Sequence, residues 1–351
     1  MLPSLDIILV NRNSGKALFE CLSSVARAET TGFSLRRVCV VDDASSDNSA
    51  GGLSAIPLPL EIIRNSEHTG YGASCNRGAE RSTADYLLFL NTDSIVLADS
   101  LNTPIAYMER AEHAGVGTVG IQLLDAEGAV NRSCAGFPTF GRMIPTILGL
   151  DRLFPWLFPS HQMKAWDHLD TREVDHVMGA FMLVRRSVFD RVGGYDEQFF
   201  VYMEDLDLSR RVRRLGYREV YLASARAIHT SGGTSRHVRP ESLFFDLRSR
   251  IQYAFKHFGA FQGYLVAAVV LFLEPAVQLL FAVWQRKREK LHYIAVAYVR
   301  LWREALSGRL SGRVRRGELT GTRKLKRNAM QECGKLMERA AEGIGSSEGG
   351  S

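Results

Sequence analysis

Short apolar runs alternate with helical patterns over the first 93 residues, and this alternation restricts the fold more than any other feature. The apolar runs lie at 5–10, 38–41, 60–63 and 86–90, with helical patterns at 14–28 and 69–81. Strands that alternate with helices form right-handed βαβ units and a parallel sheet. The runs are apolar throughout, as expected where helices cover both faces of a sheet. The sequence therefore predicts an α/β fold with a mainly parallel sheet and flanking helices.

The same alternation continues beyond Asp93 with one interruption. The expected helices lie at 101–112 and 204–215, and the expected strands at 116–123, 180–184 and 220–228. The interruption, residues 137–166, is rich in proline, phenylalanine and tryptophan and has no clear period. Linkers are seldom so aromatic, so we expect an ordered excursion from the core.

The cysteines, the N-terminus and the charge narrow the class of protein. Five cysteines are scattered without metal-site spacing, which favours a reduced compartment. The N-terminus has no basic region or cleavage site, so its short apolar run is expected to be a strand and not a signal peptide. The net charge is +6, but residues 285–327 alone carry +11. This asymmetry indicates an anionic surface as the partner of one end of the chain.

Residues 259–284 are mostly apolar and long enough to span a membrane, but Glu274 and Pro275 interrupt their middle. An interfacial or re-entrant helix is favoured over a packed soluble helix and over a true span. The basic run that follows suits anionic lipid head groups. A basic tail can also bind nucleic acid, but the apolar segment before it favours a membrane, so no nucleic-acid partner is expected. We predict a helical, amphipathic and basic membrane-associating region at 237–330, and a partly disordered tail at 331–351.

Polar side chains follow five of the expected strands. They are Asn11, Asp42 with Asp43, Asn65, Asn91 with Asp93, and His229. Asp and Asn are common in turns, but open α/β sheets bind ligands at the carboxyl ends of their strands. Five such ends favour a ligand crevice. The chain has no P-loop, and its G-x-G-x-x-G at 115–120 overlaps the expected strand at 116–123 and does not join a strand to a helix, which counts against a P-loop NTPase and a dinucleotide dehydrogenase.

Three polar positions each allow two interpretations. Asp93 suits a divalent cation that neutralises a diphosphate, or a helix N-cap. In the acidic start of the helix at 204–215, one carboxylate could be a general base, or the acids could simply complement the helix dipole. His229 could be a structural histidine, although the glycine pair at 232–233 would allow a ligand to approach the backbone closely.

Six segments together resemble glycosyltransferase family 2, closest to its bacterial rhamnosyltransferase-like branch. They are DIILVNRN, VVDDASSDNS, NSEHTGYGASCNRGAE, LLFLNTDS, GAFMLVRRSVFDRVGGYDEQFFVYMEDLDLSRRVRRLGY and IHTSGGTS. The resemblance covers roughly residues 5–236. It implies a GT-A catalytic domain over 1–236, with a nucleotide-binding half (1–95) and an acceptor half (96–236) that contains the excursion.

The resemblance also implies a set of site residues. Asp205 resembles the catalytic base, and Asp93 and His229 resemble the ligands of a divalent metal, Mn²⁺ or Mg²⁺. Asn91 stands where the family's D-x-D motif has its first aspartate. The residues that would contact the nucleotide sugar are Asn11, Asp42, Asp43, Asn65, Asn76, Asn91, Asp93, Gly179 and Ala180.

The implied activity is metal-dependent, inverting sugar transfer. The donor would be a dTDP- or UDP-sugar, with rhamnose favoured, and the acceptor a polyprenyl-diphosphate-linked or cell-envelope glycan. The enzyme would be cytoplasmic and peripherally bound to the inner face of the cell membrane, and an oligomer is compatible with the sequence.

The sequence leaves three alternatives to this activity open. They are transfer of galactofuranose, glucose or N-acetylglucosamine, an inactive nucleotide-sugar-binding membrane scaffold, and a nucleotidyltransferase. The last normally has a Gly-rich N-terminal loop, whereas residues 11–16 hold one glycine.

Overall fold

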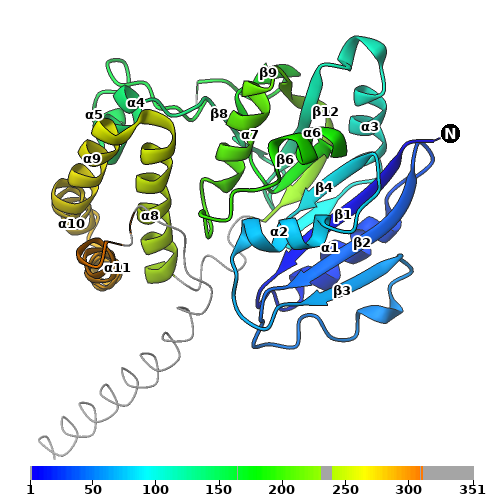
Figure 1. Ribbon diagram of the computed structural model, residues 1–351, viewed down its shortest axis with the longest axis horizontal. Helices are drawn as coiled ribbons and strands as arrows, with labels where there is room; N and C mark the ends of the chain where they lie inside the picture. Colours follow the sequence, from blue (N-terminus) through cyan, green and yellow to red (C-terminus); the bar gives the residue numbers. More distant parts are fainter. Residues whose placement is uncertain (1, 164, 231–238, 309, 311–351) are drawn as a thin grey trace, which may run out of the picture. The chain divides into compact units, whose positions relative to one another are not determined.

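The computed structural model describes residues 2–163, 165–230, 239–308 and 310. Within them, ten strands form one sheet in the order β3-β2-β1-β4-β11-β6-β12-β5, with β7 beside β6 and β9 beside β12 (Figure 1). A separate pair is formed by β8 and β10. In chain order the strands are β1 (Ser4–Asn11), β2 (Ser34–Asp42), β3 (Leu60–Arg64), β4 (Tyr86–Leu90), β5 (Ser94–Val96), β6 (Val116–Leu124), β7 (Val130–Asn131), β8 (Cys134–Ala135), β9 (Arg172–Val174), β10 (His176–Val177), β11 (Phe181–Arg185) and β12 (Arg218–His229).

The N-terminal half of the sheet is parallel, as the alternating pattern predicts. β3, β2, β1 and β4 all run in one direction, so their carboxyl ends lie at one edge. Helices α1 (Ala17–Arg27) and α2 (Tyr71–Ala79) connect them. The predicted α/β fold is confirmed, and the sheet is that of the GT-A fold.

β11 is the exception, because it runs antiparallel to both β4 and β6. Phe181 at its start pairs with Leu90 at the end of β4. The residues just before β11 therefore reach the same edge as the carboxyl ends of the parallel strands. This reversal brings Gly179 and Ala180 to the polar edge of the sheet.

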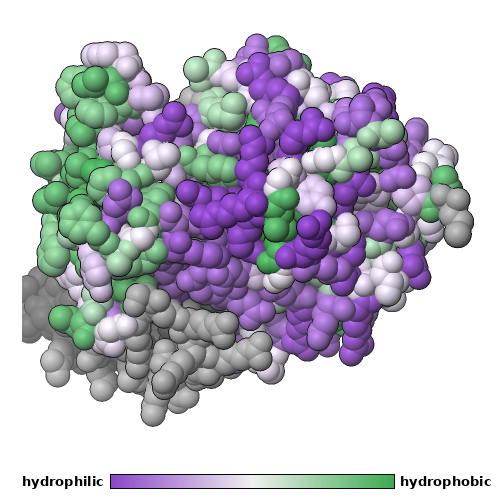
Figure 2. Space-filling view, turned by 45° about the horizontal axis from the view of Figure 1, so that its top comes forward, coloured by the Kyte–Doolittle hydropathy of each residue, from purple (hydrophilic) through white to green (hydrophobic). Residues whose placement is uncertain are grey.

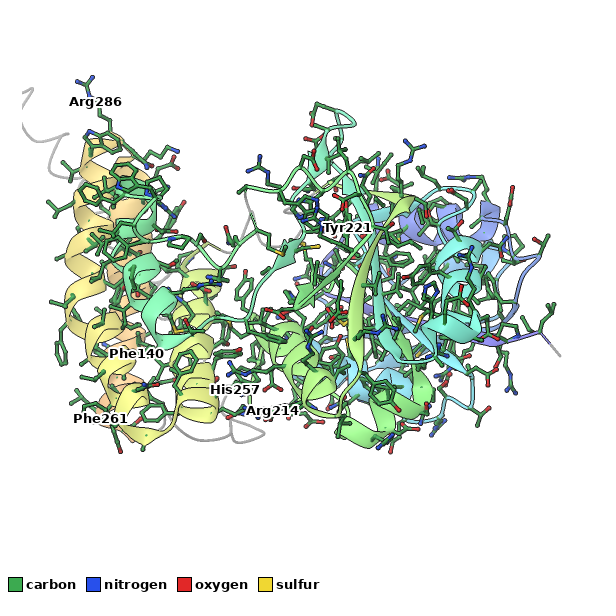
Figure 3. The ribbon with its side chains drawn as sticks, turned by 90° about the horizontal axis from the view of Figure 1, so that it is seen from above. Phe140, Arg214, Tyr221, His257, Phe261 and Arg286 are labelled. Atoms are coloured by element: carbon green, nitrogen blue, oxygen red, sulfur yellow. The ribbon has the colours of Figure 1, made fainter. Side chains whose placement is uncertain are left out.

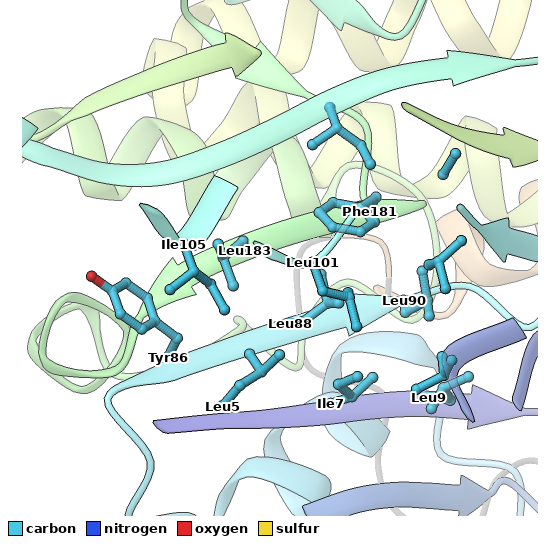
Figure 4. Close-up of a cluster of buried hydrophobic side chains, with 14 of the residues drawn as sticks. Leu5, Ile7, Leu9, Tyr86, Leu88, Leu90, Leu101, Ile105, Phe181 and Leu183 are labelled. Atoms are coloured by element: carbon cyan, nitrogen blue, oxygen red, sulfur yellow. The ribbon is translucent and has the colours of Figure 1, made fainter. Parts of the chain in front are cut away.

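Side chains of the central strands are buried on both faces of the sheet. Leu5, Ile7 and Leu9 of β1 point to one face, together with Leu88 and Leu90 of β4 (Figure 4). Ile8, Leu87 and Phe89 alternate with them and belong to the core on the opposite face. A period of two with both sets buried is what a central strand covered by helices requires.

Five further helices lie between β5 and β12, two of them in the excursion. They are α3 (Asn102–Met108), α4 (Phe140–Ile147), α5 (Leu150–Leu153), α6 (Arg186–Val192) and α7 (Glu204–Arg214), with 3-10 turns at Leu53–Ala55 and Ala111–His113. The helix expected at 101–112 is shorter, because the backbone at Arg110 is extended. The excursion is ordered as expected, but it contains helix α4, which the sequence pattern missed because Pro145 lies inside it.

The C-terminal helices share a third core with α4. They are α8 (Arg239–Phe258), α9 (Ala260–Ala268), a π-helical turn (Val269–Leu273), α10 (Glu274–Trp284) and α11 (Arg288–Leu306). Their buried side chains include Leu247, Ile251, Val270 and Leu301. The boundary expected at 236/237, residues 309 and 311–327 of the basic run, and the tail at 331–351 lie outside the described residues.

We expect Gly120→Ala to destabilise the sheet, because β10 packs directly on Gly120 of β6. A Cβ at this position would lie 2.6 Å from Cβ of Val177 and 2.8 Å from both of its methyl groups. Overpacking of this kind costs about 1–3 kcal/mol. Urea unfolding would measure the loss, and a second change, Val177→Ala, should recover part of it. Gly141→Ala in α4 is the control, because nothing lies within 4 Å of its added Cβ. Equal effects at the two glycines would contradict the packing argument.

Candidate nucleotide-sugar and catalytic site

Asn11 and Asp42 lie opposite each other at the ends of β1 and β2. The Asn11 side chain is buried and its Nδ2 donates to Asp42 Oδ1 (2.9 Å) and to Ser49 Oγ (2.9 Å). The two predicted residues are thus brought together at the polar edge. Their side chains are held rigidly, which suits recognition of a nucleotide.

Asp43 is buried and organises the loop that follows β3. Its carboxylate accepts from Asn65 Nδ2 (2.8 Å) and from the backbone N–H groups of Thr69 (2.8 Å) and Gly70 (3.0 Å), and it lies 2.6 Å from His68 Nδ1. These partners lower its pKa below the ordinary value although burial acts in the opposite direction. The sequence reasoning missed His68, whose only signal was its place in the segment NSEHTGYG.

Asn76 differs from the other predicted nucleotide contacts. Its side chain is paired with the backbone of Tyr195, accepting from the N–H (2.8 Å) and donating to the carbonyl oxygen (2.9 Å). Nδ2 also lies 3.2 Å from Glu197 Oε1. Asn76 therefore holds α2 to the loop before α7, and these hydrogen bonds do not join it to the other candidate residues. Its side chain therefore has a packing role, and its assignment to the nucleotide stays a prediction.

Asp93 and His229 lie side by side at the ends of β4 and β12. Oδ1 of Asp93 is 3.2 Å from Nε2 of His229, and β5 places Ser94 in register with His229. The helix N-cap interpretation of Asp93 is wrong, because strand β5 and not a helix follows it. The segment after Asp93 is a strand because β5 pairs with the distant β12, and no local sequence pattern indicates this pairing.

The spacing of Asp93 and His229 fits a shared metal ion. Two ligands about 2.1 Å from an octahedral ion and at right angles to each other are separated by about 3.0 Å. The observed 3.2 Å between Oδ1 and Nε2 is close to this value. Among the described residues, no group of three or more His, Cys, Asp or Glu side chains could hold a metal. Two protein ligands with a phosphate and water are, however, a usual arrangement for Mg²⁺.

Gly179 and Ala180 connect the two polar clusters. The Asn91 N–H donates to the Ala180 carbonyl oxygen (3.1 Å), and the Gly179 N–H donates to Asp205 Oδ2 (3.1 Å). A Cβ on Gly179 would lie 3.3 Å from that same oxygen. The segment before β11 thus places Asp205 next to the strand end that carries Asn91 and Asp93. Tyr71 also reaches it, donating from its hydroxyl to the Gly179 carbonyl (3.3 Å).

The structure distinguishes the three acids at the start of α7. Glu204 is buried, and desolvation together with the Asp205 charge raises its pKa well above the ordinary value. Asp207 is fully buried, and its negative charge is balanced by surrounding cations. These lower its pKa to about 2, although burial acts in the opposite direction. Asp205 is the one whose side chain is partly exposed, at 22%. Of the three, only Asp205 combines access to a substrate with a free lone pair.

Asp207 joins α7 to the C-terminal helices. Its carboxylate lies 2.6 Å from Lys256 Nζ, 2.7 Å from His257 Nε2 and 2.7 Å from Arg211 Nε. Lys256 and His257 belong to the end of α8, where Figure 3 shows His257 facing the catalytic region. Helix α7 is therefore fixed to the C-terminal helices through this ionic cluster around the buried Asp207.

A strained turn introduces α7. Tyr202 (φ 67°) and Met203 (φ 66°) both have left-handed backbones although neither is glycine. Each costs of order 1 kcal/mol and persists only where surrounding structure enforces it. Such strain is concentrated at functional sites, and here it directs the first turn of α7 toward Gly179.

Two buried groups behind Asp205 were missed by the sequence reasoning. Nε2 of His176 lies 3.6 Å from Asp205 Oδ2, and Glu219 lies beyond it. Neither follows a motif, because His176 belongs to a two-residue strand and Glu219 lies near the start of β12, where it pairs with Thr118 of β6.

Comparison with known proteins follows the geometry. The family model for glycosyl transferase family 2 matches residues 6–193. An N-acetylglucosaminyl-diphospho-decaprenol L-rhamnosyltransferase of Mycobacterium tuberculosis is 27% identical over 242 residues, which are 65% of this chain and 76% of that protein. Rhamnosyltransferase WbbL of Escherichia coli is 34% identical over 170 residues, 48% of this chain and 61% of that protein.

One solved structure supports the fold. A mannosyltransferase of Pyrobaculum calidifontis, solved with GDP-mannose and Mn²⁺, aligns with a TM-score of 0.50 and 16% identity, over 94% of this chain and 81% of that one. At this identity the likeness concerns the fold alone.

Proposed function

The chain belongs to glycosyl transferase family 2, and we propose that it transfers rhamnose from a nucleoside-diphosphate sugar to a hydroxyl of a lipid-linked cell-envelope glycan. The family membership supports sugar transfer from a nucleotide donor. The names of the two relatives support rhamnose, and the decaprenol in one of them supports a lipid-linked acceptor.

The observation that carries the proposal is that Asp205 is partly exposed, whereas the two neighbouring acids are buried. It is the partly exposed carboxylate in a row of three acids, and Gly179 and Ala180 join it to the end of β4. A general base must lie within hydrogen-bond reach of the proton that it removes, and it must be ionised and accessible. Asp205 meets the requirement of access, whereas Glu204 and Asp207 do not.

In the proposed reaction, Asp205 accepts the proton of the acceptor hydroxyl. The oxygen forms a bond to the anomeric carbon while the bond from that carbon to the diphosphate oxygen breaks. Attack from the face opposite the leaving group inverts the configuration. Gly179 has no side chain to fill the space beside the carboxylate, which leaves room for a sugar.

Asp93 and His229 would hold a divalent cation. When bound, Mn²⁺ or Mg²⁺ supplies charge stabilisation to the leaving diphosphate. Asn91, whose N–H is tied to Ala180, fixes the turn that presents Asp93. The predicted nucleotide contacts, Asn11, Asp42, Asp43 and Asn65, lie along the same edge of the sheet.

An exposed apolar surface on the C-terminal helices suits a lipid-linked acceptor. We define the apolar surface by Phe261, Tyr264, Phe272, Leu273, Leu280, Val283 and Trp284, all exposed. Figure 2 shows hydrophobic side chains gathered over this end of the molecule, and Figure 3 places Phe261 and Arg286 at opposite ends of the helical region. Side chains this large are seldom left in water together, so the surface indicates contact with a membrane.

Among the described residues, one helix, Ala260–Trp284, has the length and composition of a membrane span. Glu274 in its middle is 3% exposed and accepts from Arg250 of α8 (2.9 Å). One side of the helix thus packs on a charged partner helix while the other faces outward. We therefore favour a helix lying in the interface at the cytoplasmic face over one surrounded by lipid.

The function is tested by nucleoside diphosphate release from a panel of dTDP- and UDP-sugars, with and without a short polyprenyl-diphosphate sugar. We expect acceptor-dependent release from dTDP-rhamnose. EDTA should reduce it to background and Mn²⁺ or Mg²⁺ should restore it, because the diphosphate otherwise leaves without charge stabilisation. Release from another donor would change the sugar. Binding of a donor without release under any condition would contradict the transferase assignment, and EDTA-resistant release would contradict the metal.

A further inference from the structure

The aromatic excursion carries an exposed apolar loop that is not part of the apolar surface. We call residues 153–158 the excursion loop, and its exposed apolar side chains are Leu153, Phe154, Trp156 and Leu157. The loop is a closed turn, because the N–H groups of Leu157 (3.1 Å) and Phe158 (3.0 Å) both donate to the Phe154 carbonyl oxygen. The rings of Phe154 and Trp156 meet edge to face, with 5.8 Å between their centroids. An ordered turn that leaves such large side chains in water, with Trp156 79% exposed, indicates a binding surface.

The excursion loop adjoins the apolar surface although the two are far apart in the sequence. Gly149, which precedes α5, packs on Phe281 of α10, and a Cβ at Gly149 would lie 2.8 Å from Cε2 of that ring. The guanidinium carbon of Arg152 lies 5.9 Å from the centre of the same ring. Phe281 in turn contacts Trp284 of the apolar surface edge to face, with 6.1 Å between the ring centroids. The two exposed areas are therefore neighbours near the end of α10, and Figure 1 shows α4 and α5 lying against the C-terminal helices.

The charge around the excursion loop suits a layer of lipid head groups. The described residues 148–163 hold one acid, Asp151, which is buried, whereas Arg152 beside it is exposed. The turn after Trp284 exposes three cations, Arg286, Lys287 and Lys290, and one acid, Glu289. Membrane-bound proteins place tryptophan and basic side chains at the level of the head groups, where the indole ring and the cations meet polar lipid groups. Trp156 with Arg152, and Trp284 with Arg286, repeat this combination.

The size of the loop distinguishes a lipid partner from a protein partner. A stable protein interface buries about 800 Å² and roughly 20–30 residues on each side. The excursion loop offers four exposed apolar side chains on one tight turn, which is too few. Insertion into lipid has no such threshold, because each apolar side chain gains on its own by leaving water. The neighbouring helix, Ala260–Trp284, also has the composition of a membrane span, so the occupant that fits the loop is the membrane interface.

The excursion also connects this loop to the proposed active site. The Gly136 N–H donates to the His161 carbonyl oxygen (2.8 Å), so the excursion begins and ends at β8. β8 pairs with β10, which leads into the segment whose N–H donates to Asp205. Arg210 of α7 donates to the Pro138 carbonyl oxygen (3.4 Å), close to the start of the excursion. A contact of the loop with a membrane therefore bears on the position of Asp205 relative to that membrane.

We propose that the excursion loop is a second membrane-contacting element, which inserts Trp156 and its apolar neighbours into the lipid interface beside Trp284. The inference rests on the membrane association in the proposed function, and not on the identity of the sugar. Two contacts from separate elements restrict the tilt of the protein on the membrane more than the α9–α10 segment does alone. Because the excursion is joined to β8 and α7, this restricted tilt also sets how far Asp205 lies from a lipid-linked acceptor.

Quenching of Trp156 by lipid is the first test. The full-length chain with Trp284→Phe is compared with the same chain that also carries Trp156→Phe, so that the difference in emission belongs to Trp156. The other tryptophans, Trp166 and Trp302, are common to both and cancel. On vesicles of phosphatidylcholine with brominated acyl chains, we expect the Trp156 emission to shift to shorter wavelength and to lose most of its intensity, because bromine quenches tryptophan on contact. Vesicles of the same lipid without bromine should give the shift alone.

A matched pair of leucines is the second test. Leu157 in the loop and Leu169 outside it are 64% and 65% exposed. The carbonyl oxygen of His168, next to Leu169, accepts from the Tyr221 hydroxyl (3.0 Å), and Figure 3 shows Tyr221 away from the helical region. Leu157→Ser should lower the membrane partition constant about tenfold in flotation, since one large apolar side chain no longer enters the lipid. Leu169→Ser should leave the partition constant unchanged.

The outcomes separate this inference from the proposed function. If the wild type floats, but the Trp156 emission is the same with and without vesicles or the two leucine variants float equally, the inference is overturned and the membrane association stands. A wild type that does not float overturns both. Sugar transfer is judged apart from either result, because nucleoside diphosphate release with a water-soluble acceptor needs no membrane. Thermal melts accompany the flotation, and a loss of binding in Leu157→Ser through unfolding, without quenching of Trp156, would also overturn the inference.

Discussion

Asp205→Asn is expected to lower kcat by at least about 100-fold, the usual contribution of a general base, while donor binding changes little. Asparagine has the shape of the aspartate, and its amide oxygen can still accept from one of the two N–H groups, of Gly179 and Leu206, that now hold the two carboxylate oxygens, so the fold of the site should persist. An amide cannot take up the proton of the acceptor hydroxyl. The loss corresponds to about 3 kcal/mol of transition-state stabilisation.

The first turn of α7 offers two matched controls. Glu204→Gln puts an amide of the same shape in place of a buried carboxyl whose pKa is raised by burial and by the Asp205 charge. This side chain has no access to a substrate, so kcat should stay near the wild-type value. Asp207→Asn removes the charge that Lys256, His257 and Arg211 surround. It should lower Tm, because the lowered pKa of Asp207, about 2, contributes roughly 2 kcal/mol of stability at neutral pH.

The sign of the Asp207 contribution also fixes its pH dependence. Because the folded-state pKa lies below the unfolded value, the contribution is complete above about pH 4 and is lost as the pH falls toward 2. Single-turnover kinetics and thermal melts of the three variants would separate the roles. Equal kcat losses in Glu204→Gln and Asp205→Asn, or full activity of Asp205→Asn, would contradict the assignment of the base.

The sequence was sufficient for those parts of the site that are local in the chain. Asn11 and Asp42 follow apolar runs that could be recognised as parallel strands, and parallel strands end at one edge of a sheet. The acidic start of α7 was likewise visible, because helical spacing and the dipole pattern are properties of one segment. Fold and family therefore followed from pattern and motif together.

The parts that the sequence could not supply depend on pairing between distant segments. Nothing local indicates that β11 is antiparallel, yet this reversal brings Gly179 to Asp205. The choice between Glu204, Asp205 and Asp207 depended on cations from α8, fifty residues later. The motif around Asn76 predicts a ligand contact, but it does not indicate that the amide also pairs with the backbone of Tyr195, more than a hundred residues later.

Glu274 is a further residue whose role depends on a distant segment and could not be predicted from the sequence. In the sequence it is a charge that interrupts an apolar helix and counts against a true membrane span. In the structure it is buried against Arg250 and Gln278, so the outward face of the helix is left apolar. The pairing of α8 with α10 converts an apparent defect into the feature that orients the helix.

Replacing Phe272, Leu280 and Trp284 of the apolar surface by serine is expected to release the protein from membranes. These side chains are 72%, 70% and 76% exposed and face away from the core. If each loses about 1.5 kcal/mol of burial in lipid, the membrane partition constant should fall by about three orders of magnitude. Flotation with neutral phosphatidylcholine vesicles would measure the change. Deletion of the whole region would be a poor test, because Leu247 and Ile251 of α8 would lose their packing partners.

Phe19→Ser with Ile62→Ser is the matched control, because these exposed apolar side chains lie on α1 and β3, far along the chain from the apolar surface. It should float like the wild type, and the triple variant should keep its kcat on a water-soluble acceptor. Adding salt distinguishes apolar binding to the vesicles from electrostatic binding. Binding through the apolar surface persists in 1 M salt, where the Debye length falls to about 3 Å. If the wild type floats only with vesicles that contain phosphatidylglycerol, is released by salt, and is unaffected by the triple substitution, then basic residues hold the protein on the membrane and the apolar surface does not.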